Sequence, residues 1–154
     1  MELSKSSIDE RMMRLALIEA QKAADEGEVP TGCVITDGEG RIIGKAHNQT
    51  EVLHDATAHA EMIALSQAFE ALGNERLPNT TLYVTKEPCP MCAGAISLAR
   101  VSRVVWGVDD PKRGGASIFD IFNHKGMNHH PETAHGVMEK ESLAILQDFF
   151  RSRR

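Results

Sequence analysis

Apolar side chains recur at helical spacing in several stretches of the chain. Between residues 8 and 26 they repeat every third or fourth position, and Gly27 then supplies a stop signal. The same period runs through residues 58–72 and 140–150, and a proline followed by small residues indicates a further helix over about residues 90–100. Each predicted helix has an apolar side, so we expect it to pack on a flat apolar surface.

Short runs of β-branched and apolar residues predict strands that would supply this surface. Five strands are predicted, at residues 32–36, 41–46, 81–85, 101–108 and 135–137. The first two flank Asp37-Gly38-Glu39-Gly40, a turn sequence that predicts a hairpin. The third and fourth enclose a helix, and this order predicts a parallel pair with a right-handed crossover. We therefore expect an α/β fold, a three-layer α/β/α sandwich with a central five-stranded mixed sheet.

Residues 109–128 interrupt the alternation of helices and strands. Pro111, Gly114, Gly115 and Gly126 make the segment irregular, with a short helix expected at residues 117–122. Long loops at the end of a sheet usually shape a site, so we expect this loop to border one.

Composition narrows the class of protein. A chain of 154 residues with 42% hydrophobic and 25% charged residues fits one domain, residues 1–154, with a full core. Three cysteines are too few for a disulfide framework and favour a reducing compartment, so we expect a cytoplasmic protein. No apolar stretch approaches the length needed to cross a bilayer, and we expect no membrane partner.

The charge distribution limits the possible partners. A net charge of −5 argues against indiscriminate binding to nucleic acid. The chain nevertheless ends in three arginines, Arg151, Arg153 and Arg154. They form either a frayed basic terminus or a contact with phosphate groups, and the sequence leaves both open.

Two cysteines at metal-ligand spacing open the helix predicted at residues 90–100. The free N–H groups and positive dipole end of a helix N-terminus favour thiolate over thiol at Cys89 and Cys92. His59, two positions before Glu61, is the expected third ligand. One nitrogen and two sulfur ligands leave a coordination position open, as catalytic zinc sites require.

The combination H-x-E followed by P-C-x-x-C is typical of zinc nucleobase deaminases. We therefore expect one Zn²⁺ per chain, with Glu61 as the base that moves protons between water and substrate. Because both helices begin at the site, their N-termini should meet at the carboxyl ends of adjacent strands.

Each of these residues also has a structural interpretation. The cysteines and His59 could form a closed structural zinc site, and Glu61 could be an ordinary surface residue of its helix. Cys33 and Trp106 lie inside predicted strands and are expected in the core. The remaining histidines lack the paired spacing of a Cys₂His₂ site.

Several segments carry a resemblance to a known family. They are Glu28-Val29-Pro30, His47-Asn48, Thr57-Ala58-His59-Ala60-Glu61, Thr81-Leu82-Tyr83-Val84-Thr85, Glu87-Pro88-Cys89-Pro90-Met91-Cys92-Ala93-Gly94, Met127-Asn128-His129 and Phe149-Phe150-Arg151. In these segments the chain resembles the bacterial tRNA-specific adenosine deaminases of the cytidine deaminase-like superfamily. The resemblance implies a homodimer that converts the wobble adenosine of a tRNA anticodon loop to inosine.

The resemblance also implies roles for individual residues. It assigns zinc to His59, Cys89 and Cys92, and proton transfer to Glu61. It further implies that Asn48 hydrogen-bonds the target base and that Asp110 lies near the substrate backbone. The remaining substrate contacts are expected at Val29, Pro30, Pro88 and His129.

Departures from the family pattern keep other functions open. Lys86 stands where the family often has an apolar residue, and Ala116-Ser117-Ile118-Phe119 also differs from its pattern. Lys86 and the acidic charge favour an alternative substrate, a free base or nucleoside of the guanine, adenine or cytosine type. A third hypothesis is a non-catalytic, zinc-stabilised partner subunit of a deaminase complex, against which the presence of Glu61 argues.

Overall fold

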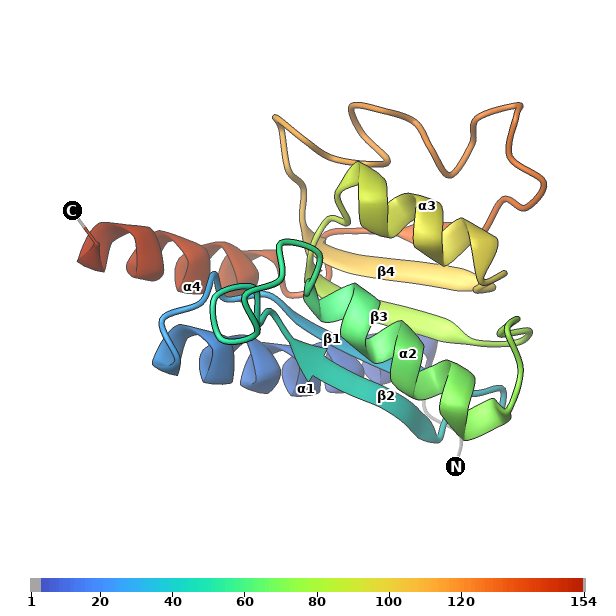
Figure 1. Cartoon of the computed structure of the whole chain (residues 1–154), viewed down its shortest axis with the longest axis horizontal. Coiled ribbons are helices and arrows are strands. Elements are labelled where there is room, and N and C mark those ends of the chain that lie inside the picture. Colours follow the sequence, from blue (N-terminus) through green and yellow to red (C-terminus); the bar gives the residue numbers. More distant parts are fainter. Residues whose placement is uncertain (1–3, 154) are drawn as a thin grey trace.

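Four helices and five strands follow one another along residues 4–153, the part of the chain that the computed structural model describes (Figure 1). In chain order they are α1 (Lys5–Asp25), β1 (Gly32–Thr36), β2 (Ile42–His47), α2 (Ala60–Leu72), β3 (Thr81–Lys86), α3 (Pro90–Leu98), β4 (Arg103–Val108), β5 (Glu132–Ala134) and α4 (Glu139–Ser152). None of these helices is long and apolar enough to span a bilayer.

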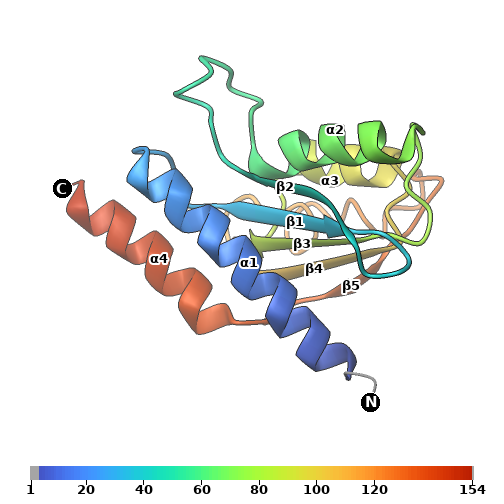
Figure 2. The ribbon, with the colours of Figure 1, turned by 90° about the horizontal axis from the view of Figure 1, so that it is seen from below.

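The strands form one mixed sheet in the order β2-β1-β3-β4-β5. β1 runs antiparallel to both β2 and β3, whereas β3, β4 and β5 run parallel to one another. Helices α2 and α3 cover one face of the sheet, and α1 and α4 lie on the other (Figure 2). This arrangement confirms the predicted three-layer α/β/α sandwich with a five-stranded mixed sheet.

Side chains that alternate along the central strands fill the two layers of core. On β1, Cys33 and Ile35 pack into the cluster beneath α2 and α3, whereas Val34 packs into the cluster beneath α1. Trp106 on β4 belongs to the first cluster and is 4% exposed. The core positions predicted for Cys33 and Trp106 are therefore confirmed.

Two glycines let helices lie directly on the sheet. A Cβ atom at Gly32 would overlap the carbonyl oxygen of Ala16 on α1. A Cβ atom at Gly44 would lie 2.6 Å from the carbonyl oxygen of Ala64 on α2. The backbone-to-helix contact at Gly44 sets the height of α2 above β2, and α2 carries part of the candidate site.

The last strand was predicted at the wrong residues. β5 is Glu132–Ala134, which pairs with Arg103–Val105, and not residues 135–137. This edge strand is mostly exposed, so it lacks the apolar alternation that marks a strand in a sequence. Gly136 has a φ of +81° and lies in the connection between β5 and α4.

The predicted short helix at residues 117–122 is also absent from the described structure. Successive turns occupy this stretch, and Asp120 has a positive φ of 51°. The N–H groups of Ala116 and Ser117 donate to the Glu87 carboxylate, so a partner outside the loop determines its course. At the N-terminus, α1 begins three residues earlier than predicted because Ser4 caps it, its side chain accepting from the Ser7 N–H.

Candidate active site

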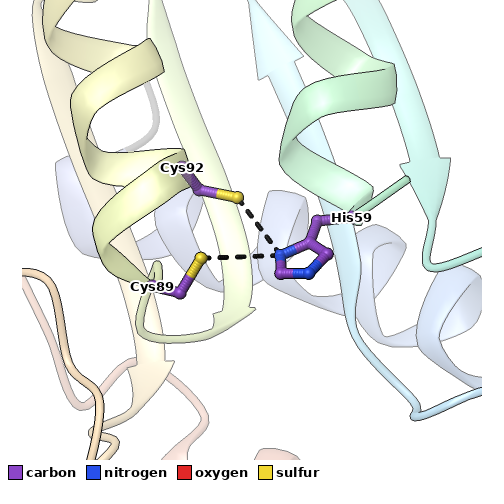
Figure 3. Close-up of side chains that lie close together, drawn as sticks. All are labelled: His59, Cys89 and Cys92. Atoms are coloured by element: carbon purple, nitrogen blue, oxygen red, sulfur yellow. Dashed lines mark hydrogen bonds between the residues drawn. The ribbon is translucent and has the colours of Figure 1, made fainter. Parts of the chain in front are cut away.

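Three metal-ligand side chains meet where α2 and α3 begin (Figure 3). His59 immediately precedes α2, Cys89 immediately precedes α3, and Cys92 lies in the first turn of α3. The Nδ1 atom of His59 lies 3.5 Å from the Cys89 sulfur and 3.4 Å from the Cys92 sulfur. Residues about thirty positions apart therefore converge as the sequence predicts.

The spacing of these donor atoms fits a tetrahedral zinc ion. Zn–S bonds of about 2.3 Å and Zn–N bonds of about 2.0 Å at tetrahedral angles put nitrogen and sulfur ligands about 3.5 Å apart. The observed 3.4 and 3.5 Å agree with this value. Within residues 4–153, no fourth histidine, cysteine or carboxylate joins the cluster. The donor set is that of an open, catalytic type of zinc site and differs from a closed structural one.

The strands that deliver the two helices are not neighbours, contrary to our expectation. β1 lies between β2 and β3 in the sheet. Because β1 is antiparallel to both, β2 and β3 run in the same direction and end at the same edge. The two helix N-termini still lie together, since α2 and α3 run side by side on the same face of the sheet and both begin at this edge (Figure 1).

The thiols and the imidazole shift one another's protonation. Hydrogen bonding with Cys92 and with His59 lowers the pKa of Cys89 to about 4, although burial opposes this shift. The hydrogen bond to Cys89 raises the pKa of the buried Cys92 thiol, and burial adds to the effect. Hydrogen bonding to Cys89 also raises the pKa of His59. The cluster therefore holds a thiolate at Cys89 at neutral pH, ready to bind a cation.

A cavity of about 280 Å³ opens beside the metal ligands. His59, Cys89 and Glu61 line it together. This volume lies just below the usual range for drug-sized ligands, about 300–1,000 Å³, and therefore suits a single base. Glu61 is 3% exposed, and its burial raises the pKa of its carboxyl group to about 7.

The substrate contacts predicted from the sequence fall into two groups. Val29, Asn48 and Asp110 line the same cavity as Glu61. Pro30, next to Val29, and Pro88, next to Cys89, are buried and lie outside the lining of the cavity. His129 is not brought to this cavity.

A backbone contact holds His129 at the other end of α3. Its Nε2 atom lies 2.6 Å from the Val101 carbonyl oxygen. Together with Leu98 and Arg100 it lines a separate hollow near the end of α3. Within a single chain His129 lies apart from the cavity, because its ring packs against the segment between α3 and β4, and its contact with substrate stays a prediction.

Asn48 has a structural task that the sequence did not reveal. Its side-chain oxygen accepts a hydrogen bond of 2.8 Å from the N–H of Ala60, the first residue of α2. It thus satisfies a free donor at the helix N-terminus beside His59. The side chain that was expected to contact the base also fixes the metal-ligand helix.

Comparison with known proteins agrees with this site. Residues 8–154 match the model of the MafB19-like deaminase family. The chain belongs to this family, among its bacterial tRNA-specific adenosine deaminases. It is 48% identical over 143 residues to the tRNA-specific adenosine deaminase of Agrobacterium fabrum, covering 92% of this chain and 93% of that protein. It is 46% identical over 147 residues to the corresponding Bacillus subtilis enzyme, covering 95% and 91%.

A solved structure shares both the fold and much of the sequence of this deaminase. It comes from a study of A-to-I editing by tRNA:A34 deaminases at the wobble position of transfer RNA. The two chains superpose with a TM-score of 0.85 at 47% identity, over 88% of this chain and 99% of that one.

Two buried carboxylates that sequence reasoning missed hold the cavity walls of the deaminase. Glu28, 1% exposed, accepts hydrogen bonds from the N–H groups of Glu51 and Val52 and from the Thr50 hydroxyl. Burial opposes ionisation, yet these bonds leave the pKa of Glu28 below its usual value. Glu28 precedes Val29-Pro30, a segment singled out by the resemblance, but its partners lie more than 20 residues away and leave no local signal.

Glu87 plays the same part for the opposite wall. It is 3% exposed and accepts from the N–H groups of Asp110, Ala116 and Ser117 and from the Ser117 hydroxyl. Gly114 passes so close that a Cβ atom there would overlap the Glu87 carboxylate. This carboxylate fixes residues 110–117, which include the cavity-lining Asp110.

Lys86 forms an ion pair within the wall of the cavity. Its ammonium nitrogen lies 3.2 Å from an Asp110 carboxylate oxygen, and both residues line the cavity. Burial raises the pKa of Asp110, but hydrogen bonds from Lys112 and Arg113 and the charge of Lys86 outweigh it, so the net shift is downward. The departure from the family pattern at Lys86 thus lies inside the candidate site.

The C-terminal arginines are tied to the protein where the structure describes them. Arg153 donates to the Gly27 carbonyl oxygen, and its guanidinium lies 4.5 Å from the centre of the Phe149 ring. Arg151 pairs with Asp148 at 3.2 Å. Arg154 lies outside the described residues. Arg153 is therefore part of the packing of α4 against the end of α1, and is not frayed.

Proposed function

We propose that this protein is a zinc-dependent hydrolytic deaminase that converts adenosine to inosine at the wobble position of a tRNA anticodon. The observation that carries the proposal is the convergence of His59, Cys89 and Cys92 beside a cavity that Glu61 also lines. Relatives with 46–48% identity along more than nine-tenths of the chain are tRNA-specific adenosine deaminases, which supports the choice of substrate.

The three donors would hold one zinc ion per chain. Bound there, the ion supplies Lewis acidity that lowers the pKa of water to about 7. Glu61 would take the proton of the attacking water and pass it to a ring nitrogen of the base. It would then move a second proton, from the added hydroxyl group that becomes the product carbonyl, to the amino group, which leaves as ammonia. A carboxyl group whose pKa is about 7 can both accept and release a proton at neutral pH.

The remaining cavity residues would orient the base. Asn48 lines the cavity while its side-chain oxygen is held by Ala60, so its amide N–H groups are the ones available to a base. Val29 offers an apolar contact to the ring, and Asp110 lies at the wall that Glu87 fixes. A cavity of this size admits a base turned out of the anticodon loop, as enzymes acting on a ring atom require.

We also propose that the enzyme acts as a homodimer in the cytoplasm. Loops whose backbones Glu28 and Glu87 hold expose large apolar side chains, with Val52 50%, Leu53 52%, Ile118 50% and Phe119 52% exposed. Apolar groups on loops beside a site favour burial against another chain. Three free cysteines suit a reducing compartment, where tRNA is also found.

The function is tested by supplying the purified enzyme with tRNA, nucleosides and free bases and following inosine, xanthine and uracil. We expect inosine in tRNA alone. Glu61→Ala should retain one zinc per chain and the folded state while losing at least about 100-fold in rate, because it removes the proton carrier. Turnover of free bases with no tRNA binding would overturn the proposed substrate, and an active Glu61→Ala variant would overturn the proposed role of Glu61.

A further inference from the structure

We propose that Lys86 is a phosphate-binding residue of the cavity, and that its ligand is a backbone phosphodiester beside the target adenosine. Lys86 then acts within the tRNA deamination proposed above, on which this inference rests. From the sequence, a charge at this position favoured a free base or nucleoside. The contacts of Lys86 in the structure point to the opposite conclusion.

Lys86 lies where a nucleotide would meet the sheet. It is the last residue of β3 and pairs with Val108 at the end of the parallel strand β4. Ligands of α/β sheets bind outside the carboxyl ends of such strands. Its side chain is 33% exposed and lines the same cavity as His59 and Glu61. The ammonium group is therefore within the site and still open to solvent.

Asp110 holds the Lys86 ammonium in place. The side chain of Asp110 is 15% exposed, and one of its oxygens accepts from the N–H groups of Lys112 and Arg113, each at 3.0 Å. Its other oxygen lies 3.2 Å from the Lys86 nitrogen. Within residues 4–153, Asp110 is the one salt-bridge partner of Lys86. An ammonium group has three N–H donors, so two remain for a ligand.

Charge in the cavity explains why that ligand would be a phosphodiester. Glu61, Glu87 and Asp110 all line the cavity, and their carboxylates oppose the approach of a polyanion. Lys86, with Arg113 on the same lining, supplies the compensating positive charge. A neutral base or nucleoside gains little from an ammonium group, whereas a phosphodiester gains a charge-assisted hydrogen bond. Lys86 thus favours a nucleic acid over a free base.

The test uses an anticodon stem-loop RNA whose phosphates near the target adenosine are replaced, one at a time, by neutral methylphosphonates. Wild type, Lys86→Met and Lys86→Arg are compared for affinity, and Lys45→Met, which removes an exposed lysine on β2, is the control. We expect Lys86→Met to bind unmodified RNA about tenfold more weakly. Its log–log salt slope should fall by about 0.7, the value for one single-strand phosphate contact. Lys86→Arg should retain most of the affinity, and Lys45→Met should match wild type.

The neutral linkages identify the contact itself. At one position the neutral linkage should lower the RNA affinity of wild type about tenfold and leave the affinity of Lys86→Met unchanged, because the variant has already lost that contact. Zinc content should be equal in all variants, since Lys86 is not a ligand. If every neutral linkage lowers the RNA affinity of Lys86→Met as much as that of wild type, Lys86 contacts no phosphate and the inference is wrong.

A second variant separates phosphate binding from simple neutralisation of Asp110. If Lys86→Met/Asp110→Asn regains wild-type affinity and salt slope, Lys86 serves only to balance Asp110 and the inference is wrong. If the double variant keeps the smaller slope, the inference stands. Failure of wild type to form inosine in this RNA would instead overturn the proposed function, and is read out independently of the variants.

Discussion

Replacing Glu87 by Gln tests whether one buried carboxylate holds the cavity wall after β4. Gln keeps the size and shape of the side chain but exchanges an acceptor oxygen for an NH₂ group. If that group replaces Oε1, it faces the Asp110 N–H and the Ser117 hydroxyl, and the hydroxyl can rotate to accept. If it replaces Oε2, it opposes the N–H groups of both Ala116 and Ser117. The first orientation therefore costs less.

The expected loss of stability in Glu87→Gln follows from that first orientation. One buried N–H loses its acceptor, and the remaining bonds lose the negative charge that strengthens them. We expect the free energy of unfolding to fall by about 2–4 kcal/mol in Glu87→Gln. Ser117→Ala removes only the hydroxyl donor and should cost about 1 kcal/mol.

Urea unfolding measures the loss, with Glu70→Gln, at an exposed position on α2, as the matched control. Hydrogen exchange should accelerate at the amides of Asp110, Ala116 and Ser117, and kcat/KM for tRNA should fall because Asp110 lines the cavity. If Glu87→Gln is as stable as Glu70→Gln and its loop amides exchange at the wild-type rate, the carboxylate does not hold the wall.

Three further outcomes are expected. In Glu28→Gln the loss of stability should depend on pH: burial raises the pKa of Glu28, but hydrogen bonds from Val52 and Glu51 outweigh it, so the folded pKa lies below the unfolded value of about 4.3. The difference in free energy of unfolding between wild type and Glu28→Gln, measured with urea, should be largest above that pH and should shrink as the pH falls through the folded pKa. A difference that grows in acid would contradict this. Gly44→Ala should lower both the melting temperature and the zinc affinity, because the new Cβ would lie 2.6 Å from the Ala64 carbonyl oxygen and displace α2. The control Gly94→Ala, with no atom within 4 Å of the new Cβ, should leave both unchanged. Chelation should abolish inosine formation and lower the melting temperature, and added zinc should restore both; full activity after verified metal removal would exclude a zinc mechanism.

The sequence predicted what depends on local pattern. Apolar periodicity located three helices, a proline before small residues located α3, and β-branched and apolar runs located four of the five strands. The spacing of Cys89 and Cys92, with His59, located the metal ligands. It failed at β5, an exposed edge strand whose pairing with β4 comes from its partner and not from its own side chains.

Contacts between distant segments were beyond reach of the sequence. Nothing near Glu87 indicates that its partners lie 23 to 30 residues further along the chain. Lys86 was noticed as a departure, but its ion pair with Asp110 depends on the course of the loop that Glu87 holds. His129 matched a family motif, yet the chain carries it to the far end of α3.

The hydrogen bonds accepted by Glu28 and Glu87 allow many side chains of the cavity walls to be substituted. Most of their donors are main-chain N–H groups, of Glu51, Val52, Asp110 and Ala116 among others. Every amino acid except proline offers the same group, so the side chains of Glu51, Val52 and Ala116 can be exchanged while the walls keep their course, whereas the Asp110 carboxylate has contacts of its own. New preferences for neighbouring nucleotides can therefore accumulate one substitution at a time on an unaltered backbone, and proline is the one replacement that this route forbids.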